Sequence, residues 1–206
     1  MMIYCVWFYQ LELIKFFFFD FDFIFYNFLL FLTKLNGIRN LQFFIAKFCW
    51  GGDFVKYEIN DETLALIKNG KKTKVLEYAD EYNIDETPYE VMEHSCSYFG
   101  SSLEGRLNGS KSILGSVYKV PIMVEETQKL IFFPTEAINS PNVAWISYKN
   151  IKNVEKYGKK SIIRFVNGYN LIINCPYFTL KNQIFRCNML DSISSSRKAP
   201  KKTINL

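Results

Sequence analysis

The stretch that decides the fold is SIIRFVNGYNLIINC, residues 161–175. Residues 161–166 and 169–175 are rich in β-branched and aromatic side chains, which favour strands. Between them stands Asn167-Gly168, the strongest short hairpin signal in the chain. The stretch therefore predicts two antiparallel strands joined by a tight turn.

A helix is expected directly after this hairpin. Beyond Pro176 the spacing of apolar residues changes from two to about 3.6, and the residues at helical spacing are Leu180, Ile184, Cys187 and Leu190. Thr179 can cap such a helix. Its apolar side would cover one face of a sheet, so we expect an α+β fold, mainly antiparallel β-sheet with a C-terminal helix packed on it.

Weaker signals extend this pattern towards the N-terminus. Strands are predicted at 55–60, 63–68, 73–78, 89–92, 113–124, 130–133, 143–148 and 151–156. The first two of these form a candidate hairpin turning at Asn60-Asp61, and 80–88 is predicted to be an acidic loop and 134–142 a second loop. A short helix over 103–107, capped by Ser101-Ser102, is the one helical candidate in this part.

Glycine and serine are most frequent between His94 and Val124, in HSCSYFGSSLEGRLNGSKSILGSVYKVPIMV. Backbone can approach a ligand closely at glycine, and serine hydroxyls and bare amides donate hydrogen bonds. The cations set among them make this stretch suited to a phosphate-rich partner. Arg106 is singled out because arginine enters narrow A/T minor grooves. The predicted DNA-binding residues are Ser101, Ser102, Gly105, Arg106, Lys111, Lys119, Lys149, Lys152, Arg164 and Arg186.

Charge is divided unevenly along the chain, whose net charge is +5. Residues 1–54 are neutral, residues 55–93 carry −5, and residues 94–206 carry +10. Such asymmetry is typical of a polyanion-binding part, although an ordinary basic surface has the same signature.

Catalytic and metal-binding motifs are missing from the sequence. The five cysteines are scattered without a CxxC pair, and His94 is the only histidine, so neither a disulfide framework nor a zinc site is expected. Gly109-Ser110-Lys111-Ser112 lacks the Gly-Lys-Ser/Thr ending of a Walker A loop, and no GxSxG occurs. We expect neither enzyme activity nor a cofactor.

The first 54 residues differ in composition from the rest and hold fourteen of the twenty phenylalanines. Membrane anchoring by FFFFDFDFIFYNFLLFL, residues 16–32, is not expected, since each aspartate near the centre of a span costs about 2.5–3.5 kcal/mol and offsets several phenylalanines. A signal peptide would need a basic start and a small-residue cleavage site. We instead hypothesise that 1–54 is upstream sequence read in frame. The codons of Trp50-Gly51-Gly52-Asp53 can contain a ribosome-binding sequence, and Val55 can be encoded by the start codon GTG.

A series of short motifs in order resembles the competence transcription factor family (ComK) of Gram-positive bacteria over roughly Tyr57 to Leu190. The motifs are Ser95-Cys96, Phe99-Gly100-Ser101-Ser102, Gly105-Arg106 with Gly109, Pro121-Ile122-Met123-Val124, Ile131-Phe132-Phe133-Pro134-Thr135, Trp145-Ile146-Ser147, Phe165 with Asn167-Gly168, and Asn182-Gln183 with Arg186. No single motif is specific, but their order and spacing are.

This resemblance implies a transcriptional activator that binds A/T-rich double-stranded DNA upstream of DNA-uptake genes, mainly through the minor groove. It also implies homo-oligomers (a dimer or a dimer of dimers), contact with RNA polymerase, control by an adaptor-protease machinery, and a cytoplasmic, nucleoid-associated location. No helix-turn-helix signature appears in the sequence, which fits minor-groove binding better than a recognition helix. The family's longer C-terminal extension is reduced here to Arg197–Leu206.

The expected organisation is therefore a Phe-rich segment over 1–54, a DNA-binding domain over 55–191 and a flexible basic tail over 192–206. Two alternatives stay open: a non-catalytic interaction module that binds acidic partners or lipid head groups, and a silent copy of the activator.

Overall fold

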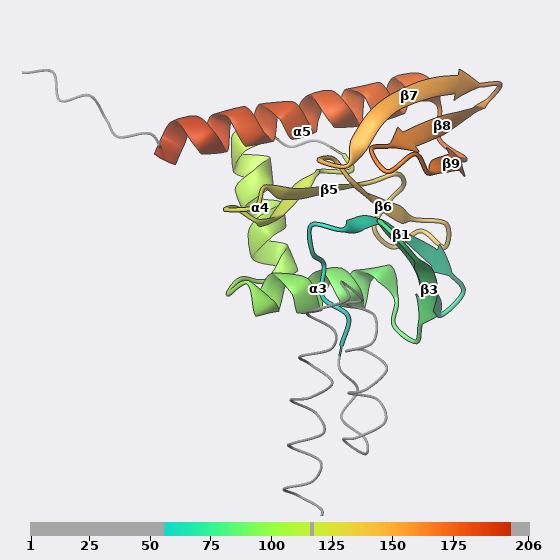
Figure 1. The fold of residues 1–206 in the computed structure, drawn as a ribbon. Helices are drawn as coiled ribbons and strands as arrows, with labels where there is room; N and C mark the ends of the chain where they lie inside the picture. Colours follow the sequence, from blue (N-terminus) through green and yellow to red (C-terminus); the bar gives the residue numbers. More distant parts are fainter. Residues whose placement is uncertain (1–55, 116–117, 199–206) are drawn as a thin grey trace, which may run out of the picture. The chain divides into compact units, whose positions relative to one another are not determined.

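The computed structural model describes residues 56–115 and 118–198. The hypotheses about residues 1–54, and the part of the predicted tail over 199–206, lie outside the described residues. Nine strands and three helices, α3 to α5, are described (Figure 1). Every strand pairing among them is antiparallel, so the predicted α+β class with a mainly antiparallel sheet is confirmed.

The strands form two sheets. The six-stranded sheet has the order β3-β2-β1-β6-β5-β4. Its strands are β1 (Thr63–Asn69), β2 (Lys72–Glu77), β3 (Glu81–Ile84), β4 (Ile122–Glu125), β5 (Leu130–Pro134) and β6 (Ala144–Ser147). The three-stranded sheet is the meander β7 (Ile151–Tyr157), β8 (Lys160–Phe165) and β9 (Asn170–Ile173). The predicted Asn167-Gly168 hairpin joins β8 to β9. Its turn begins at Phe165, whose carbonyl accepts the amide of Gly168 (3.0 Å), and Gly168 has a φ of 91° whereas the φ of Asn167 is not positive.

Helix α5 (Tyr177–Lys198) closes the core as the sequence predicted. Its buried side chains Leu180, Cys187 and Leu190 pack in one cluster with residues of both sheets, among them Phe133 and Phe165. Figure 1 shows α5 and the three-stranded sheet on one side of the six-stranded sheet and α3 (Pro88–Tyr98) on the other. Helix α4 (Leu103–Leu114) contacts α3, β4 and α5, and so connects the two sides.

Helix α3 occupies a segment that the sequence analysis divided wrongly between an acidic loop and a short strand. The signal for it is a capping box: the hydroxyl of Thr87 accepts the amide of Glu90, and the carboxylate of Glu90 accepts the amide of Thr87. Pro88 at the first helical position adds to this start signal. The predicted loop over 80–88 is also corrected by β3, in which Tyr82 and Ile84 alternate with polar residues along an edge strand.

Three other boundaries differ from the prediction. Residues 56–60 form no strand, so the candidate hairpin at Asn60-Asp61 is wrong and β1 pairs with β2 and β6 instead. Helix α4 continues past Gly109 to Leu114, so residues 113–114 end a helix instead of starting a strand, and β4 begins only at Ile122. Packing against three neighbouring elements offsets the helix-weakening effect of glycine at 105 and 109.

Helix α5 is longer at both ends than predicted. It begins at Tyr177, directly after Pro176, so Thr179 lies inside the helix and does not cap it. It also runs to Lys198, which corrects the prediction of a flexible tail for residues 192–198.

Candidate nucleic-acid interface

The serines and glycine at the start of α4 form a helix cap. The hydroxyl of Ser102 accepts the amide of Gly105 (3.0 Å), and the carboxylate of Glu93 accepts the amide of Leu103 (3.2 Å). A side chain at Gly105 would meet the Ser102 hydroxyl at 3.1 Å and the Ser101 hydroxyl at 3.5 Å. The amides of Leu103 and Gly105 and the hydroxyl of Ser102 are therefore already engaged within the protein.

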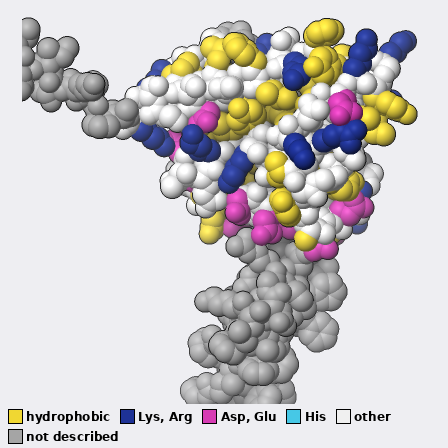
Figure 2. Space-filling view, turned by 45° about the horizontal axis from the view of Figure 1, so that its top comes forward, with side chains coloured by type: hydrophobic (Ala, Val, Ile, Leu, Met, Phe, Trp, Pro, Cys, Tyr) yellow, Lys and Arg dark blue, Asp and Glu magenta, His cyan; other side chains and the backbone are white. Residues whose placement is uncertain are grey.

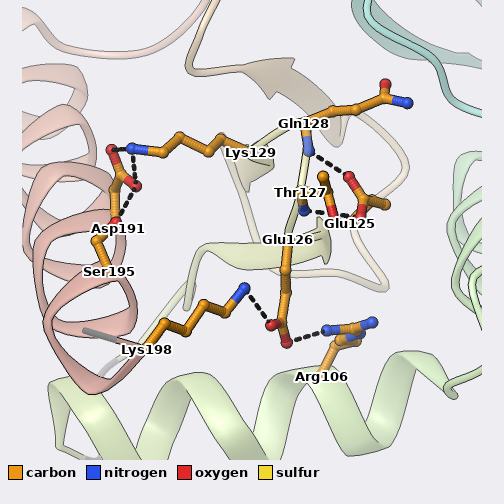
Figure 3. Close-up of polar contacts among 9 residues, drawn as sticks. All are labelled: Arg106, Glu125, Glu126, Thr127, Gln128, Lys129, Asp191, Ser195 and Lys198. Atoms are coloured by element: carbon orange, nitrogen blue, oxygen red, sulfur yellow. Dashed lines mark hydrogen bonds and ion pairs between the residues drawn. The ribbon is translucent and has the colours of Figure 1, made fainter. Parts of the chain in front are cut away.

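Arg106, placed at the centre of the predicted site, is held by an acid. Its guanidinium lies 2.9 Å from Glu126 in the β4–β5 turn, and its side chain is only 18% exposed. Glu126 also pairs with Lys198 at the end of α5 (2.7 Å), so one carboxylate joins two cations from two helices (Figure 3). The hydrogen bond from Lys198, followed by that from Arg106, lowers the pKa of Glu126 below its usual range. In this state Arg106 cannot enter a groove without leaving Glu126.

The connection between α3 and α4 has the form found in helix-turn-helix motifs, although the sequence was predicted to contain no such motif. Four residues join the helices, and Gly100 among them has a φ of 72°. A recognition helix needs a free basic face near its N-terminus. The first turn of α4 carries exposed Glu104, and Arg106 is paired with Glu126. The charge of α4 therefore does not favour a recognition helix.

Lys119 and Arg186 come together beside the middle of α5. Arg186 donates to the carbonyl of Tyr118 (2.8 Å), and buried Gln183 donates to the carbonyls of Lys119 (2.8 Å) and Pro134 (3.0 Å). Lys119 has a φ of 58° and donates to a backbone carbonyl in turn (2.8 Å). These bonds fix the 118–119 backbone against α5 and hold two predicted site residues, Lys119 and Arg186, next to each other.

A hollow of about 350 Å³ lies between α5 and the start of β7. Three lysines line it: Lys149 between β6 and β7, Lys152 in β7, and Lys181 in the first turns of α5. The lining contains no carboxylate, since its other residues are Tyr148, Ile151, Asn153, Val154 and Ile184. Several Lys and Arg side chains also gather on the face shown in Figure 2. Three cations around one hollow without an acid make it suited to an anion.

The remaining predicted residues are elsewhere. Arg164 on β8 forms a bidentate ion pair with Glu155, with nitrogen–oxygen distances of 2.7 and 2.9 Å. The pair lowers the pKa of Glu155, and the carboxylate offsets the positive charge of Arg164. Lys111 lies exposed in the last turn of α4.

Five cations thus lie beside α5, three at the hollow and two on the other flank of the helix. We call them together the α5 basic surface: Lys119, Lys149, Lys152, Lys181 and Arg186. The site predicted from the sequence omitted Lys181. Its position directly after buried Leu180 in the helical pattern placed it on the solvent side of α5, but only the fold puts it beside Lys149 and Lys152.

Among the described residues no group of His, Cys, Asp and Glu could hold a metal ion. None of the helices described for residues 56–115 and 118–198 is long and apolar enough to cross a membrane. The fold and this surface together define a small α+β domain that presents cations along one helix.

The family model described as "ComK protein" matches residues 54–199, and the chain belongs to this family. It is 29% identical over 135 residues to the competence transcription factor of Bacillus subtilis (strain 168), a match that covers 63% of this chain and 70% of the relative. No solved structure matches. The resemblance indicated by the sequence is confirmed, and the family supports a competence-related transcription regulator rather than an enzyme.

Proposed function

We propose that this chain is a DNA-binding activator of competence genes that binds A/T-rich double-stranded DNA, largely through the minor groove. The observation that carries the proposal is the convergence of Lys149, Lys152 and Lys181 on one hollow without an acid in its lining. DNA presents closely spaced phosphates, and cations that neutralise them supply the sequence-independent part of the affinity.

The α5 basic surface adds Lys119 and Arg186, which lie on the other flank of the helix from this hollow. Helix α5 has 22 residues, so it is about 33 Å long, which spans close to one turn of the duplex. The five cations lie beside the part of α5 between Lys181 and Arg186, about 7.5 Å of its length, and can contact neighbouring phosphates of the same site. The proposal includes self-association, contact with RNA polymerase and a nucleoid-associated place in the cytoplasm, as the family relationship implies.

The other predicted site residues are outside the α5 basic surface: Arg106, Lys111, Arg164 and the serines at the start of α4. Arg106 joins the site only if DNA phosphates displace Glu126, and Arg164 only if they displace Glu155. Ser101, Ser102 and Gly105 act through the start of α4 rather than by direct contact.

The test measures binding of the full chain to an A/T-box duplex and to a G/C duplex of equal length between 50 and 200 mM salt. The variant Lys149→Ala/Lys152→Ala/Lys181→Ala should lower the slope of log affinity against log salt by about 2.7, since each lost phosphate contact removes about 0.9. The control is Lys72→Ala, which removes a lysine that pairs with Asp85 on the β2–β3 hairpin. It should leave the salt slope unchanged.

Equal slopes for the triple variant and the parent would contradict the placement of the site. Equal affinity of the parent for the two duplexes would contradict A/T preference. Tighter binding to anionic vesicles than to either duplex would favour the lipid-binding alternative.

A further inference from the structure

Helix α5 exposes a row of large apolar side chains on its outer face. Phe178 is 74% exposed, Phe185 64% and Met189 37%. Their spacing of seven and four residues puts them on one line of the helix, while Leu180 and Cys187 on the opposite side are buried in the core. Single exposed apolar residues are ordinary, but an aligned row on a helix marks a contact surface.

Polar and charged side chains flank this row on both sides. On one flank, Lys181 and Ile184 border the hollow with Lys149 and Lys152. On the other, Arg186 is held against the backbone of Tyr118, whose side chain is 69% exposed. Exposed Asn182 and Asn188 lie on the same outer arc of the helix. The order across α5 is thus cations, apolar row, cations.

This arrangement has the chemistry of a partner that is negative on two edges and apolar between them. A duplex offers that pattern, with phosphate strands on both sides of a groove and stacked bases at its floor. A second copy of the same face does not, since cations would meet cations on both flanks. Asp191, the one carboxylate of α5, pairs with Lys129 at 2.9 Å and does not reduce this repulsion.

We propose that α5 lies along the DNA and that Phe185, with Phe178 as a second contact, inserts between base pairs as a wedge. This rests on the proposed function and assigns its duplex-reading element to α5 rather than α4. Wedges of Phe, Leu or Met accompanied by Arg, Lys and Asn are the set that unstacks base steps from the minor groove and bends the duplex towards the major groove.

The helix dimensions require such bending. An α-helix with its side chains is about 10–12 Å across, whereas the minor groove of straight B-DNA is about 6 Å wide. A wedge that kinks the duplex opens the groove to the helix. Phe178 and Phe185 are seven residues apart, about 10.5 Å along the helix, which matches about three base-pair steps. TA steps, frequent in A/T-rich DNA, are the easiest to unstack.

The test measures DNA bending by energy transfer between dyes at the two ends of an A/T-box duplex, with the full chain at saturating concentration. Phe185→Ala should remove most of the bend and weaken binding about tenfold, the size of one lost aromatic–base contact. It should leave the salt slope unchanged, since no phosphate contact is lost. Phe185→Leu keeps an apolar wedge and should retain most of the bend. Tyr89→Ala removes an exposed aromatic from α3 and should change nothing.

Four outcomes decide the proposal. Loss of the bend in Phe185→Ala and its retention in Phe185→Leu support it. An unchanged bend in Phe185→Ala overturns it, and the lysine variants then still decide whether the surface binds DNA. If Phe185→Ala forms smaller oligomers than the parent in sedimentation but bends DNA equally per bound protein, the wedge proposal is overturned in favour of an interface between copies of the chain. If Phe185→Ala no longer binds phosphatidylglycerol vesicles but binds DNA as the parent does, the wedge proposal is overturned in favour of a lipid surface as the partner.

Discussion

Glu126→Gln is the substitution that separates a DNA-facing Arg106 from a structural one. Glu126 lies 2.9 Å from Arg106 on α4 and 2.7 Å from Lys198 at the end of α5. Glutamine keeps the size of the side chain and removes its charge, so both cations lose their ionic partner. If these cations face DNA, phosphates compete with Glu126 for them in the parent and bind them without competition in the variant.

The size of the effect follows from the number of cations released. Each added phosphate contact steepens the slope of log affinity against log salt by about 0.9, so two contacts add up to about 1.8. Over the fourfold range from 50 to 200 mM salt, the variant should therefore lose about 12-fold more affinity than the parent. The two ion pairs are largely at the surface, so the free energy of unfolding should fall by only about 1 kcal/mol.

The assay is fluorescence anisotropy of a labelled A/T-box duplex across that salt range, with urea unfolding of the same samples. Glu81→Gln is the matched control, because it releases Lys74 from a 2.9 Å pair in the hairpin β2–β3 outside the proposed site. It should lower stability by a similar amount and leave the salt slope unchanged.

The pH dependence of stability gives an independent check. Lys198 and Arg106 lower the folded pKa of Glu126 below its ordinary 4.5. A depressed carboxyl pKa stabilises the folded state above the unfolded value, and the contribution disappears as the pH falls through the folded pKa. The stability gap between parent and Glu126→Gln should thus be full above pH 4.5 and close below it. A variant that is less stable but has the parent's salt slope would show that Arg106 and Lys198 only brace α4 against α5.

Other predictions concern single contacts. Thr87→Ala removes the capping box of α3 and should cost about 1 kcal/mol in urea unfolding. Asn150→Ala removes a buried amide that donates to two backbone carbonyls before and in β1 (3.1 and 3.0 Å), and should cost about 2–3 kcal/mol. Arg106→Ala should weaken A/T-box binding by about 1–3 kcal/mol and reduce A/T preference in gel shifts, if phosphates displace Glu126. Burial raises the pKa of the Cys187 thiol, so alkylation at pH 8 should be much slower in the folded chain than in urea.

The prediction from sequence was most accurate where local signals and packing agree. The hairpin at Asn167-Gly168 and the helix containing Leu180 and Leu190 were found because turn chemistry and apolar spacing act within a few residues. The prediction was wrong at α3 because it rested on acidic composition and left out the Thr87–Glu90 capping box. The prediction ended α4 at Leu107, seven residues early, because the packing partners that stabilise its second half are distant in sequence.

The candidate site shows the same difference between local signals, which the sequence contains, and contacts between distant segments, which it does not. The charge imbalance of the chain drew attention to its basic part, and Lys119, Lys149, Lys152 and Arg186 lie on the α5 basic surface. The emphasis on Arg106 did not anticipate Glu126, which is 20 residues away in the chain and meets it only through the β4–β5 turn.

The sequence by itself determined the antiparallel hairpins, the C-terminal helix, the family and the sign of the charge, because each depends on residue types at short or ordered spacing. Only the tertiary structure decided which cations are paired with acids and which converge on one surface. Those outcomes depend on contacts between segments far apart in the chain, such as Arg106 with Glu126 and Lys149 with Lys181, which no local pattern specifies.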